Sequence, residues 1–486
     1  MGYRLGRTAV LMAFVASATL SCATNPATGK REFNLMSEAQ EVALGQQSDP
    51  QIRQEMGVYA DADLQRYVES VAMPLAKNSE RPDLPWTFAI VDSPSVNAFA
   101  VPGGFIYLTR GILAHLNNEA ELAGVLGHEI AHVTARHSAA QYSKATGASI
   151  GLLLGQIFVP ELRPFGQAAE TGLGVLFLKF GRDDELEADR LGAGYAARNG
   201  WDPAGVPSLL ETLGRLSEGT DRKGVPNWLS THPMPEDRVA RVQDVVASLK
   251  AGAPQLNVRR AEFLQRIDGL VFGENPSEGI VRGDSFLHPD LRFSLQFPAQ
   301  WPVQNAPTQV VARAPSGNAV VFLQLVPQPQ GNGMEAIAAN DLRDSGLRLV
   351  TGGETRINGL DAYLGTFQGQ MQGVGNAGLR IAWIAHDRRV YRIAGLAPVE
   401  VFRQVEPAFS STARSFRPLG NDEARDVRPN VVRLHTVRAG ETWQSIAAGP
   451  GASIVPADTL AVMNGVAANE QPRAGDRIKI VQEQRQ

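Results

Sequence analysis

The chain of 486 residues contains a single cysteine, Cys22, and carries a net charge of −4. One cysteine cannot form a disulfide within the chain, so the folded state must be held by packed cores. The slightly negative charge argues against the basic surface of a nucleic-acid-binding protein, and we expect no nucleic acid among the partners. Long apolar runs are also scarce, and the run 9–20 is too short for an ordinary membrane-spanning helix.

The first 22 residues have the order of properties of a secretory signal peptide. Arg4 and Arg7 precede the apolar run, and small residues follow it up to Cys22. The stretch "TLSC" is similar to a bacterial lipobox, although Thr19 stands where an aliphatic residue is usual. We expect lipidation of Cys22 and a periplasmic protein anchored to the outer membrane, because Ala23 is not the aspartate typical of inner-membrane retention. Plain secretion is the alternative.

The rest of the composition is typical of a multidomain globular protein. Hydrophobic residues make up 43% and charged residues 20% of the chain, and this length usually forms about two to four domains. We expect a mainly helical domain with a small β-sheet over 30–270 and an α+β domain over 280–418. A charged linker over 419–433 and a small module over 434–482 complete the predicted organisation.

Hydrophobic periodicity and turn signals predict most elements of the first domain. Helices are expected over 34–47, 61–77, 111–145, 184–198, 204–217 and 235–250, and strands over 86–93 and within 97–111 around a Pro-Gly-Gly turn. The segment 147–180 is rich in glycine and apolar residues. We expect buried or lid helices there, and shallow insertion into a bilayer is the less favoured alternative.

The stretch "GVLGHEIAHVTARH" over 124–137 carries the strongest chemical signal. His128 and His132 are four residues apart, so on a helix they lie on one face and can bind one Zn²⁺. Glu129 points to the side, where it can act as a general base on a water that zinc activates. The alternative is a helix whose two histidines bind no metal. We expect one zinc ion per chain.

A catalytic zinc usually has three protein ligands and one open position. Glu185 and Asp189 in "ELEAD" are four apart on one helix face, whereas Glu187 points elsewhere. Spacing alone does not decide which carboxylate binds the metal and which one supports it. His137 lies about 140° round a continuous helix from His132, so we expect it at the surface or behind a ligand.

Four stretches in this order resemble a family of zinc peptidases that includes HtpX and the CAAX prenyl proteases. They are "NPATGKREFNLMSEAQEVALG", "NAFAVPGGFIYLTRGIL", "HEIAHVTARH" with the later "ELEAD", and "LSTHPMPEDRVARV". The resemblance covers about 25–250 and is greatest to the soluble periplasmic, BepA-like subgroup. The helical repeats that follow the peptidase in that subgroup are absent here, so their partner-recruiting role is not transferred.

The resemblance implies a zincin-type, gluzincin-like peptidase domain and assigns further roles. It makes Glu185 the third zinc ligand and Asp189 the supporting acid. His232 matches a histidine near the zinc that serves as a gate or fourth ligand. Arg238 would stabilise an oxyanion, or form an ordinary ion pair. The edge strand that pairs with an extended substrate would be formed by Asn97, Ala98, Phe99 and Ala100.

The two C-terminal domains give weaker signals. "HTVRAGETWQSIA", "MNGV" and "AGDRIKIV" resemble a LysM module with βααβ order, which implies binding to peptidoglycan. A degenerate module that only supports folding or contacts protein is the alternative. The domain over 280–418 resembles, weakly, the PsbP type. It has no catalytic cluster, and we expect structural or surface roles for His288 and His386.

These observations favour a zinc-dependent metalloendopeptidase of the bacterial envelope that removes unfolded or misassembled proteins. The substrate class is what the resemblance implies. One alternative is a gated, chaperone-like or scaffold protein in which His232 plugs the zinc. Another is a peptidoglycan-associated hydrolase, which is less favoured because such zinc enzymes carry two histidines separated by one residue and this chain has no such pair.

Overall fold

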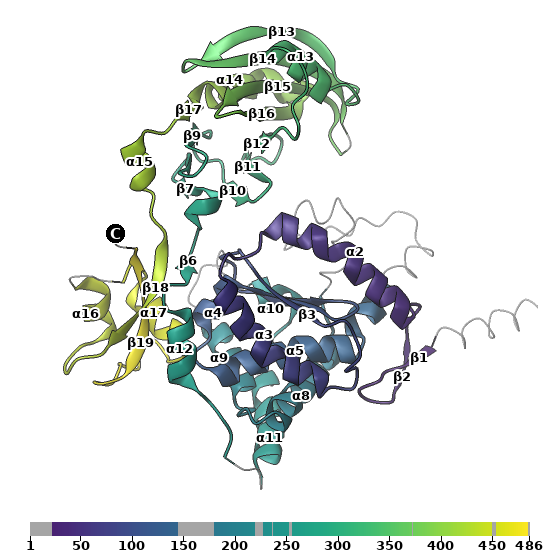
Figure 1. Ribbon diagram of the computed structural model, residues 1–486, viewed down its shortest axis with the longest axis vertical. Coiled ribbons are helices and arrows are strands. Elements are labelled where there is room, and N and C mark those ends of the chain that lie inside the picture. Colours follow the sequence, from purple (N-terminus) through teal and green to yellow (C-terminus); the bar gives the residue numbers. More distant parts are fainter. Residues whose placement is uncertain are drawn as a thin grey trace, which may run out of the picture. The chain divides into compact units, whose positions relative to one another are not determined.

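The computed structural model describes residues 22–143, 179–218, 227–235, 237–251, 255–371, 373–449 and 453–484. The predicted signal peptide before Cys22 and nearly all of the Gly-rich segment 147–180 lie outside the described residues. The chain divides into two compact units (Figure 1). Unit 1 joins the residues up to Phe272 with Asn430–Glu483, and unit 2 comprises Gly273–Pro429. The multidomain organisation expected from the length is therefore present.

A three-stranded sheet lies at the centre of unit 1. Its order is β3 (Thr87–Val91), β5 (Phe105–Thr109) and β4 (Ala98–Val101), with β3 parallel and β4 antiparallel to β5. The Pro-Gly-Gly turn joins β4 to β5, and Gly103 and Gly104 both have positive φ. A Cβ on Gly103 would lie 2.7 Å from the Glu41 carbonyl oxygen, so the turn also needs glycine for its close packing.

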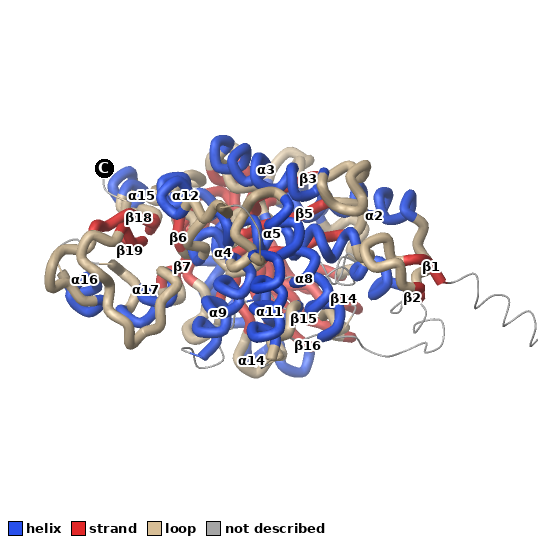
Figure 2. Tube along the Cα trace, turned by 90° about the horizontal axis from the view of Figure 1, so that it is seen from below, coloured by secondary structure: helices blue, strands red, loops and turns tan. Residues whose placement is uncertain are grey.

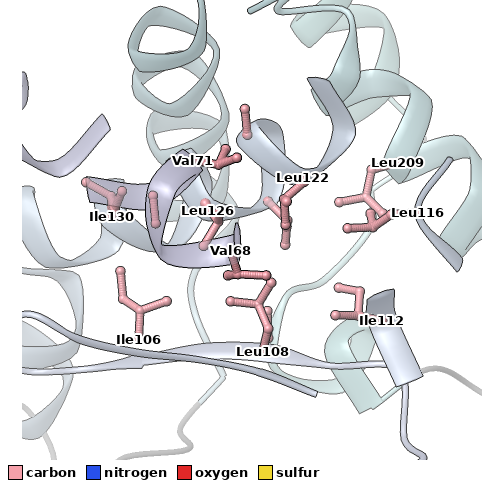
Figure 3. Close-up of a cluster of buried hydrophobic side chains, with 14 of the residues drawn as sticks. Val68, Val71, Ile106, Leu108, Ile112, Leu116, Leu122, Leu126, Ile130 and Leu209 are labelled. Atoms are coloured by element: carbon pink, nitrogen blue, oxygen red, sulfur yellow. The ribbon is translucent and has the colours of Figure 1, made fainter. Parts of the chain in front are cut away.

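Helices surround this sheet (Figure 2). They are α2 (Glu38–Met56), α3 (Ala62–Lys77), α4 (Arg110–His115), α5 (Glu119–Thr134), α8 (Arg182–Arg198), α9 (Gly205–Glu218), α10 (Asn227–Thr231), α11 (Arg238–Lys250) and α12 (Arg260–Ile267). Every residue of α5 is buried. Its Leu122, Leu126 and Ile130, spaced by four, share a hydrophobic core with Val68 of α3 and Leu108 of β5 (Figure 3).

The single helix expected over 111–145 is wrong, because the chain breaks it twice. Helix α4 ends at His115, and Asn118 begins α5 by accepting a hydrogen bond from the Glu121 amide with its side chain. Helix α5 ends at Thr134, and Arg136 adopts a left-handed conformation with φ of 61°. Residues 137–143 are then helical again. The second break changes where His137 points.

The C-terminal segment folds as part of unit 1. Its elements are β18 (Asn430–Thr436), α16 (Trp443–Ala448), α17 (Ala457–Met463) and β19 (Arg477–Glu483). Strand β6 (Val271–Phe272) pairs with β18, which pairs with β19 (Figure 1). Val432 of β18 belongs to the same core as α3 and α5. The predicted linker 419–433 contains the short helix α15 (Asn421–Arg425) and the start of β18.

Unit 2 is built mostly of antiparallel strands. Its seven-stranded sheet has the order β10 (Val303–Ala306), β11 (Gln309–Arg313), β12 (Val320–Leu325), β16 (Arg389–Pro398), β15 (Gly375–His386), β14 (Leu360–Met371) and β13 (Arg348–Ile357). A second sheet contains β17 (Arg417–Pro418), β9 (Phe293–Gln296), β8 (Ser285–His288) and β7 (Ile280–Arg282). Helix α13 (Met334–Asp341) packs against β14, and α14 (Val399–Ser415) packs against β15 and β16.

The close packing of α14 depends on glycines in the sheet. A Cβ on Gly378 of β15 would lie 2.5 Å from the ring of Phe402, and one on Gly395 of β16 would lie 2.1 Å from the ring of Phe409. Two α14 aromatics therefore rest directly on the sheet backbone. Within the described parts of both units, no helix combines the length and the apolar character needed to cross a membrane.

Candidate metal centre

Two helices bring the predicted zinc ligands together because they cross at glycines. A Cβ on Gly127 of α5 would lie 2.8 Å from the carbonyl oxygen of Gly192 of α8, so the two backbones touch at this point. The approach places His128 and His132 of α5 opposite Glu185 of α8. All three side chains are buried.

The ligand atoms converge on one point. The Nε2 atoms of His128 and His132 lie 3.0 Å apart, and the carboxylate oxygens of Glu185 lie 3.6 Å and 3.5 Å from them. One ligand atom from each of these residues and from His232 lies within 4.8 Å of all the others. With zinc–ligand bonds of about 2.0–2.2 Å, tetrahedral ligand atoms are about 3.3–3.6 Å apart. The donor set therefore fits one zinc ion.

The protonation states suit metal binding. Burial lowers the pKa of His132 well below its ordinary value, which keeps the imidazole in the neutral form that binds metals. Burial alone would raise the pKa of Glu185. The positive charges of His232 and Arg238 outweigh burial, so the pKa lies well below its usual range and the carboxylate is ionised.

Asp189 supports the first histidine. Its Oδ1 lies 2.9 Å from His128 Nδ1, so the carboxylate accepts that proton and leaves Nε2 free for the metal. Arg238 in turn donates two hydrogen bonds to Asp189, of 2.7 Å and 2.9 Å. Sequence spacing could not choose between Glu185 and Asp189, whereas the structure turns Glu185 towards both histidines.

The surroundings of Arg238 match the ion-pair alternative for this residue. Its guanidinium is fully buried. It lies 2.7 Å from a carboxylate oxygen of Glu185, and it donates a hydrogen bond to the Pro233 carbonyl. These contacts direct its N–H groups at carboxylates and backbone. Arg238 therefore pairs with Glu185 and Asp189 and holds both side chains in place.

Glu129 keeps an unpaired oxygen beside the cluster. Its Oε1 accepts a 3.3 Å hydrogen bond from Trp228 Nε1. Its Oε2 is buried and has no hydrogen-bond partner among the described residues. An unpartnered buried carboxylate oxygen is costly, and a catalytic role is one explanation for such an atom. Glu129 lies beside the cluster, with its Oε1 3.7 Å from Nε2 of His232, so it is placed to act as a general base there.

His232 completes the cluster from the segment after α10. Its Nδ1 lies 2.9 Å from Glu185 Oε1 and 3.2 Å from His128 Nε2. Its ring stacks on Trp228, with centroids 4.5 Å apart. Phe180 covers the other ligand by stacking on His132 at 3.9 Å. Sequence reasoning missed both aromatics. The position of Trp228 four residues before His232 was the available signal.

The predicted substrate strand is the edge strand of the central sheet. Among the described strands, β4 lies at the edge of the sheet and pairs with β5, and it packs against α5. The side chains of Asn97, Ala98, Phe99 and Ala100 are buried. The backbone N–H of Asn97 donates to Thr109 Oγ1 at 3.1 Å. The side-chain Oδ1 of Asn97 has no hydrogen-bond partner among the described residues.

The remaining predicted residues are not members of this cluster. Cys22 begins the short strand β1 (Cys22–Thr24). His288 and His386 belong to unit 2, where His288 Nδ1 accepts from the Leu291 amide and His386 Nε2 lies 3.0 Å from the Arg292 carbonyl. His288 therefore has a local backbone contact, and His386 has a backbone contact with a segment distant in the sequence but within the same unit.

Two helices that present an H-E-x-x-H pair and a glutamate ligand define a helical metallopeptidase-type centre. Residues 61–246 match the family model described as Peptidase family M48, so the chain contains a peptidase M48 domain. The chain is 34% identical to the beta-barrel assembly-enhancing protease of Escherichia coli over 229 residues, which is 45% of this chain and 46% of that protein.

Similarity extends to a mitochondrial protein. The chain is 37% identical to the mitochondrial metalloendopeptidase OMA1 of Arabidopsis thaliana over 166 residues, 34% of this chain and 32% of that protein. It therefore spans less than half of either relative. Among solved structures, cyanobacterial PsbP from Synechocystis matches 30% of this chain and 98% of its own, with 13% identity and a TM-score of 0.23. That likeness carries no functional argument.

Proposed function

We propose that the chain is a zinc-dependent metalloendopeptidase of the bacterial cell envelope. The main support is that the buried side chains of His128, His132 and Glu185 bring their ligand atoms together beside Glu129, whose buried Oε2 has no hydrogen-bond partner among the described residues. Relatives named as a protease and as a metalloendopeptidase support the assignment. His128, His132 and Glu185 would hold one zinc ion.

The chain's own groups divide the work of peptide hydrolysis. Bound zinc supplies a Lewis acid and lowers the pKa of water towards about 7. Glu129 takes a proton from the attacking water through Oε2 and delivers it to the leaving amine. The hydrogen bond from Trp228 fixes the other oxygen of Glu129. β4 is an edge strand of its sheet as described, and this edge would bind an extended segment of substrate by backbone pairing.

The proposed substrates are unfolded or misassembled envelope proteins, because only an extended segment can pair with an edge strand. The similarity to a beta-barrel assembly-enhancing protease favours this class. The signal-peptide pattern and "TLSC" support a lipid-anchored periplasmic protein at the outer membrane. The element order strand, helix, helix, strand in the C-terminal segment supports a LysM-like module that binds peptidoglycan.

Cleavage of casein by the chain from Ala23 onward tests this proposal. We expect cleavage that stops when a chelator removes the metal and returns when zinc is added back. Cleavage that persists without metal would contradict a zinc-dependent mechanism.

The position of His232 favours a second candidate, a gated and chaperone-like protein. His232 offers a fourth ligand atom within 4.8 Å of those of His128, His132 and Glu185, and a fourth protein ligand would fill the position that a catalytic zinc keeps open. If the wild-type protein binds zinc but cleaves nothing, whereas His232→Ala cleaves casein, the gated form is correct. No cleavage by either protein would leave only the scaffold role.

A further inference from the structure

His137 contacts a metal ligand from behind although it lies outside the H-E-x-x-H motif. Its Nδ1 lies 3.0 Å from Nδ1 of His132, and its Nε2 lies 3.1 Å from Oε2 of Glu187. The His137 side chain is buried. The left-handed turn at Arg136 makes this contact, because it ends α5 and redirects the chain. A continuous helix would have carried His137 away from His132.

The carboxylate at the end of this chain orders the hydrogen bonds of a neutral His137. An ionised glutamate only accepts hydrogen bonds, so a neutral His137 must donate its Nε2 proton to Glu187. His137 Nδ1 is then an acceptor, and it must receive the proton on His132 Nδ1. With that proton on Nδ1, the Nε2 of His132 keeps its lone pair, and this atom faces His128 and Glu185.

The two ligand histidines are therefore oriented by two separate acids of helix α8. Asp189 contacts His128 directly and is held by Arg238. Glu187 acts on His132 through one intervening imidazole. The sequence "ELEAD" thus supplies one ligand and two supporting carboxylates. Glu187 points away from the other two along the helix, which suits it to reach His132 from the opposite side.

The chain of contacts continues into the N-terminal segment. Asn25 is buried and donates from Nδ2 to Glu187 Oε2 at 3.2 Å and to Glu32 Oε1 at 3.0 Å. Its Oδ1 accepts from the amides of Ala27 and Thr28, so the amide group cannot be reversed without losing these bonds. This tight turn joins β1 to β2 (Arg31–Phe33). Lys30 lies 3.8 Å from the other Glu187 oxygen.

We propose that His137, Glu187 and Asn25 are positioning residues that hold His132 in the tautomer able to bind zinc. The N-terminal turn that begins three residues after Cys22 is thereby a structural part of the metal centre. This inference rests on the proposed metallopeptidase function. It adds that docking of the N-terminal turn sets how tightly the enzyme holds its metal.

Zinc affinity, measured by competition with a chromogenic chelator, tests the relay in the chain from Ala23 onward. His137→Phe removes both hydrogen bonds and should weaken zinc binding by about 10- to 100-fold. Glu187→Ala should weaken it in the same direction, and Asn25→Ala should do so to a smaller extent. Asp183→Ala is the matched control, because it removes an exposed acidic group from the same helix and should leave affinity unchanged.

A double variant separates a relay from independent packing effects. If Glu187 acts only through His137, the double variant His137→Phe with Glu187→Ala should bind zinc no more weakly than His137→Phe alone. Activity of the single variants should recover in excess zinc, and their free energy of unfolding without metal should stay close to that of the wild type. A folding defect would lower that free energy, because zinc rescues folding only while it is bound. The side chain of Glu187 is only partly buried, so Glu187→Ala should disturb folding less and remains informative if His137→Phe misfolds.

The outcomes distinguish this inference from the proposed function. A wild-type protein that binds no zinc would overturn the metallopeptidase assignment itself. A wild-type protein that binds zinc, with His137→Phe and Glu187→Ala binding it equally tightly, would overturn the relay and leave the assignment standing. Additive losses in the double variant would also contradict the relay.

Discussion

Single residues decide the charge balance of the metal centre. Glu185 and Asp189 place two buried carboxylates beside a site that must also hold a dication. Arg238 contacts both acids, lies fully buried, and packs its guanidinium over the ring of Trp228. Burying an unpaired carboxylate costs several kcal/mol, so the Arg238 guanidinium compensates for the water that Glu185 and Asp189 lose.

Replacing Arg238 by methionine distinguishes the two roles considered for this residue. The variant Arg238→Met leaves two buried acids without their cation, so we expect the free energy of unfolding to fall by about 3–5 kcal/mol in urea titrations without metal. An oxyanion-stabilising residue would behave differently. It would lower kcat for casein cleavage and leave the unfolding free energy close to that of the wild type.

The residues that sequence could place are those whose role follows from local spacing. The i, i+4 pair of His128 and His132 required only a helix, and helix α5 formed around it. The partners from other elements could not be ranked, because Glu185 and Asp189 share a helix face. Phe180 had no local signal, and Trp228 had only its position four residues before His232. The contacts of both depend on how distant segments pack.

Helices α5 and α8 bring the site together by touching at glycines. A Cβ on Gly192 would lie 2.7 Å from the backbone nitrogen of His128, so the distance between the helices is set by the missing side chain. The sequence predicted both helices but not their crossing. Sequence also missed the break at Arg136, because the apolar pattern continues through it and the left-handed turn is set by tertiary contacts.

Gly192→Ala should damage the metal centre through the backbone alone. The added methyl group forces α5 and α8 apart, and we expect a loss of about 1–3 kcal/mol in unfolding free energy together with weaker zinc binding. Gly194→Ala on the same helix is the control, since nothing lies within 4 Å of its added Cβ. It should leave zinc affinity unchanged and stabilise the helix by up to about 1 kcal/mol. Equal effects of the two changes would contradict the account.

At the scale of the whole molecule, the C-terminal segment is built into the peptidase unit. Lys479 of β19 is fully buried and donates to the carbonyls of Ala114 and Leu116 at the end of α4, at 2.9 Å and 2.6 Å. Burial lowers its pKa well below the ordinary value and raises that of Glu121 on α5, and each charge partly offsets the effect on the other. Arg215 of α9 also donates to the Gly465 carbonyl.

Removing the Lys479 amine should therefore destabilise the peptidase unit. Lys479→Met leaves buried carbonyls without their donor, and we expect a loss of about 2–4 kcal/mol in the free energy of unfolding. The exposed ion pair of Lys250 with Asp202 supplies the control, because Lys250→Met should change stability by less than about 1 kcal/mol. If both variants unfold at the wild-type urea concentration, the C-terminal segment is an independent module after all.

The domain pattern in the sequence contained no sign of this integration. Composition indicated separate segments and a charged linker, because it reports where polar and proline-rich stretches lie. Pairing of β6 with β18 joins segments far apart in the sequence, and such pairing depends on three-dimensional packing rather than on local propensity. The α+β character of unit 2 was visible in the sequence as alternation and spacing over 280–418.

The central claim is that Glu129 performs proton transfer beside a zinc held by His128, His132 and Glu185. The most direct test compares wild type and Glu129→Gln for both bound zinc and casein cleavage in the same preparations. We expect one zinc per chain in both proteins, with cleavage by the wild type and a loss of at least about 100-fold in the variant. Equal cleavage by the two zinc-loaded proteins would contradict the claim.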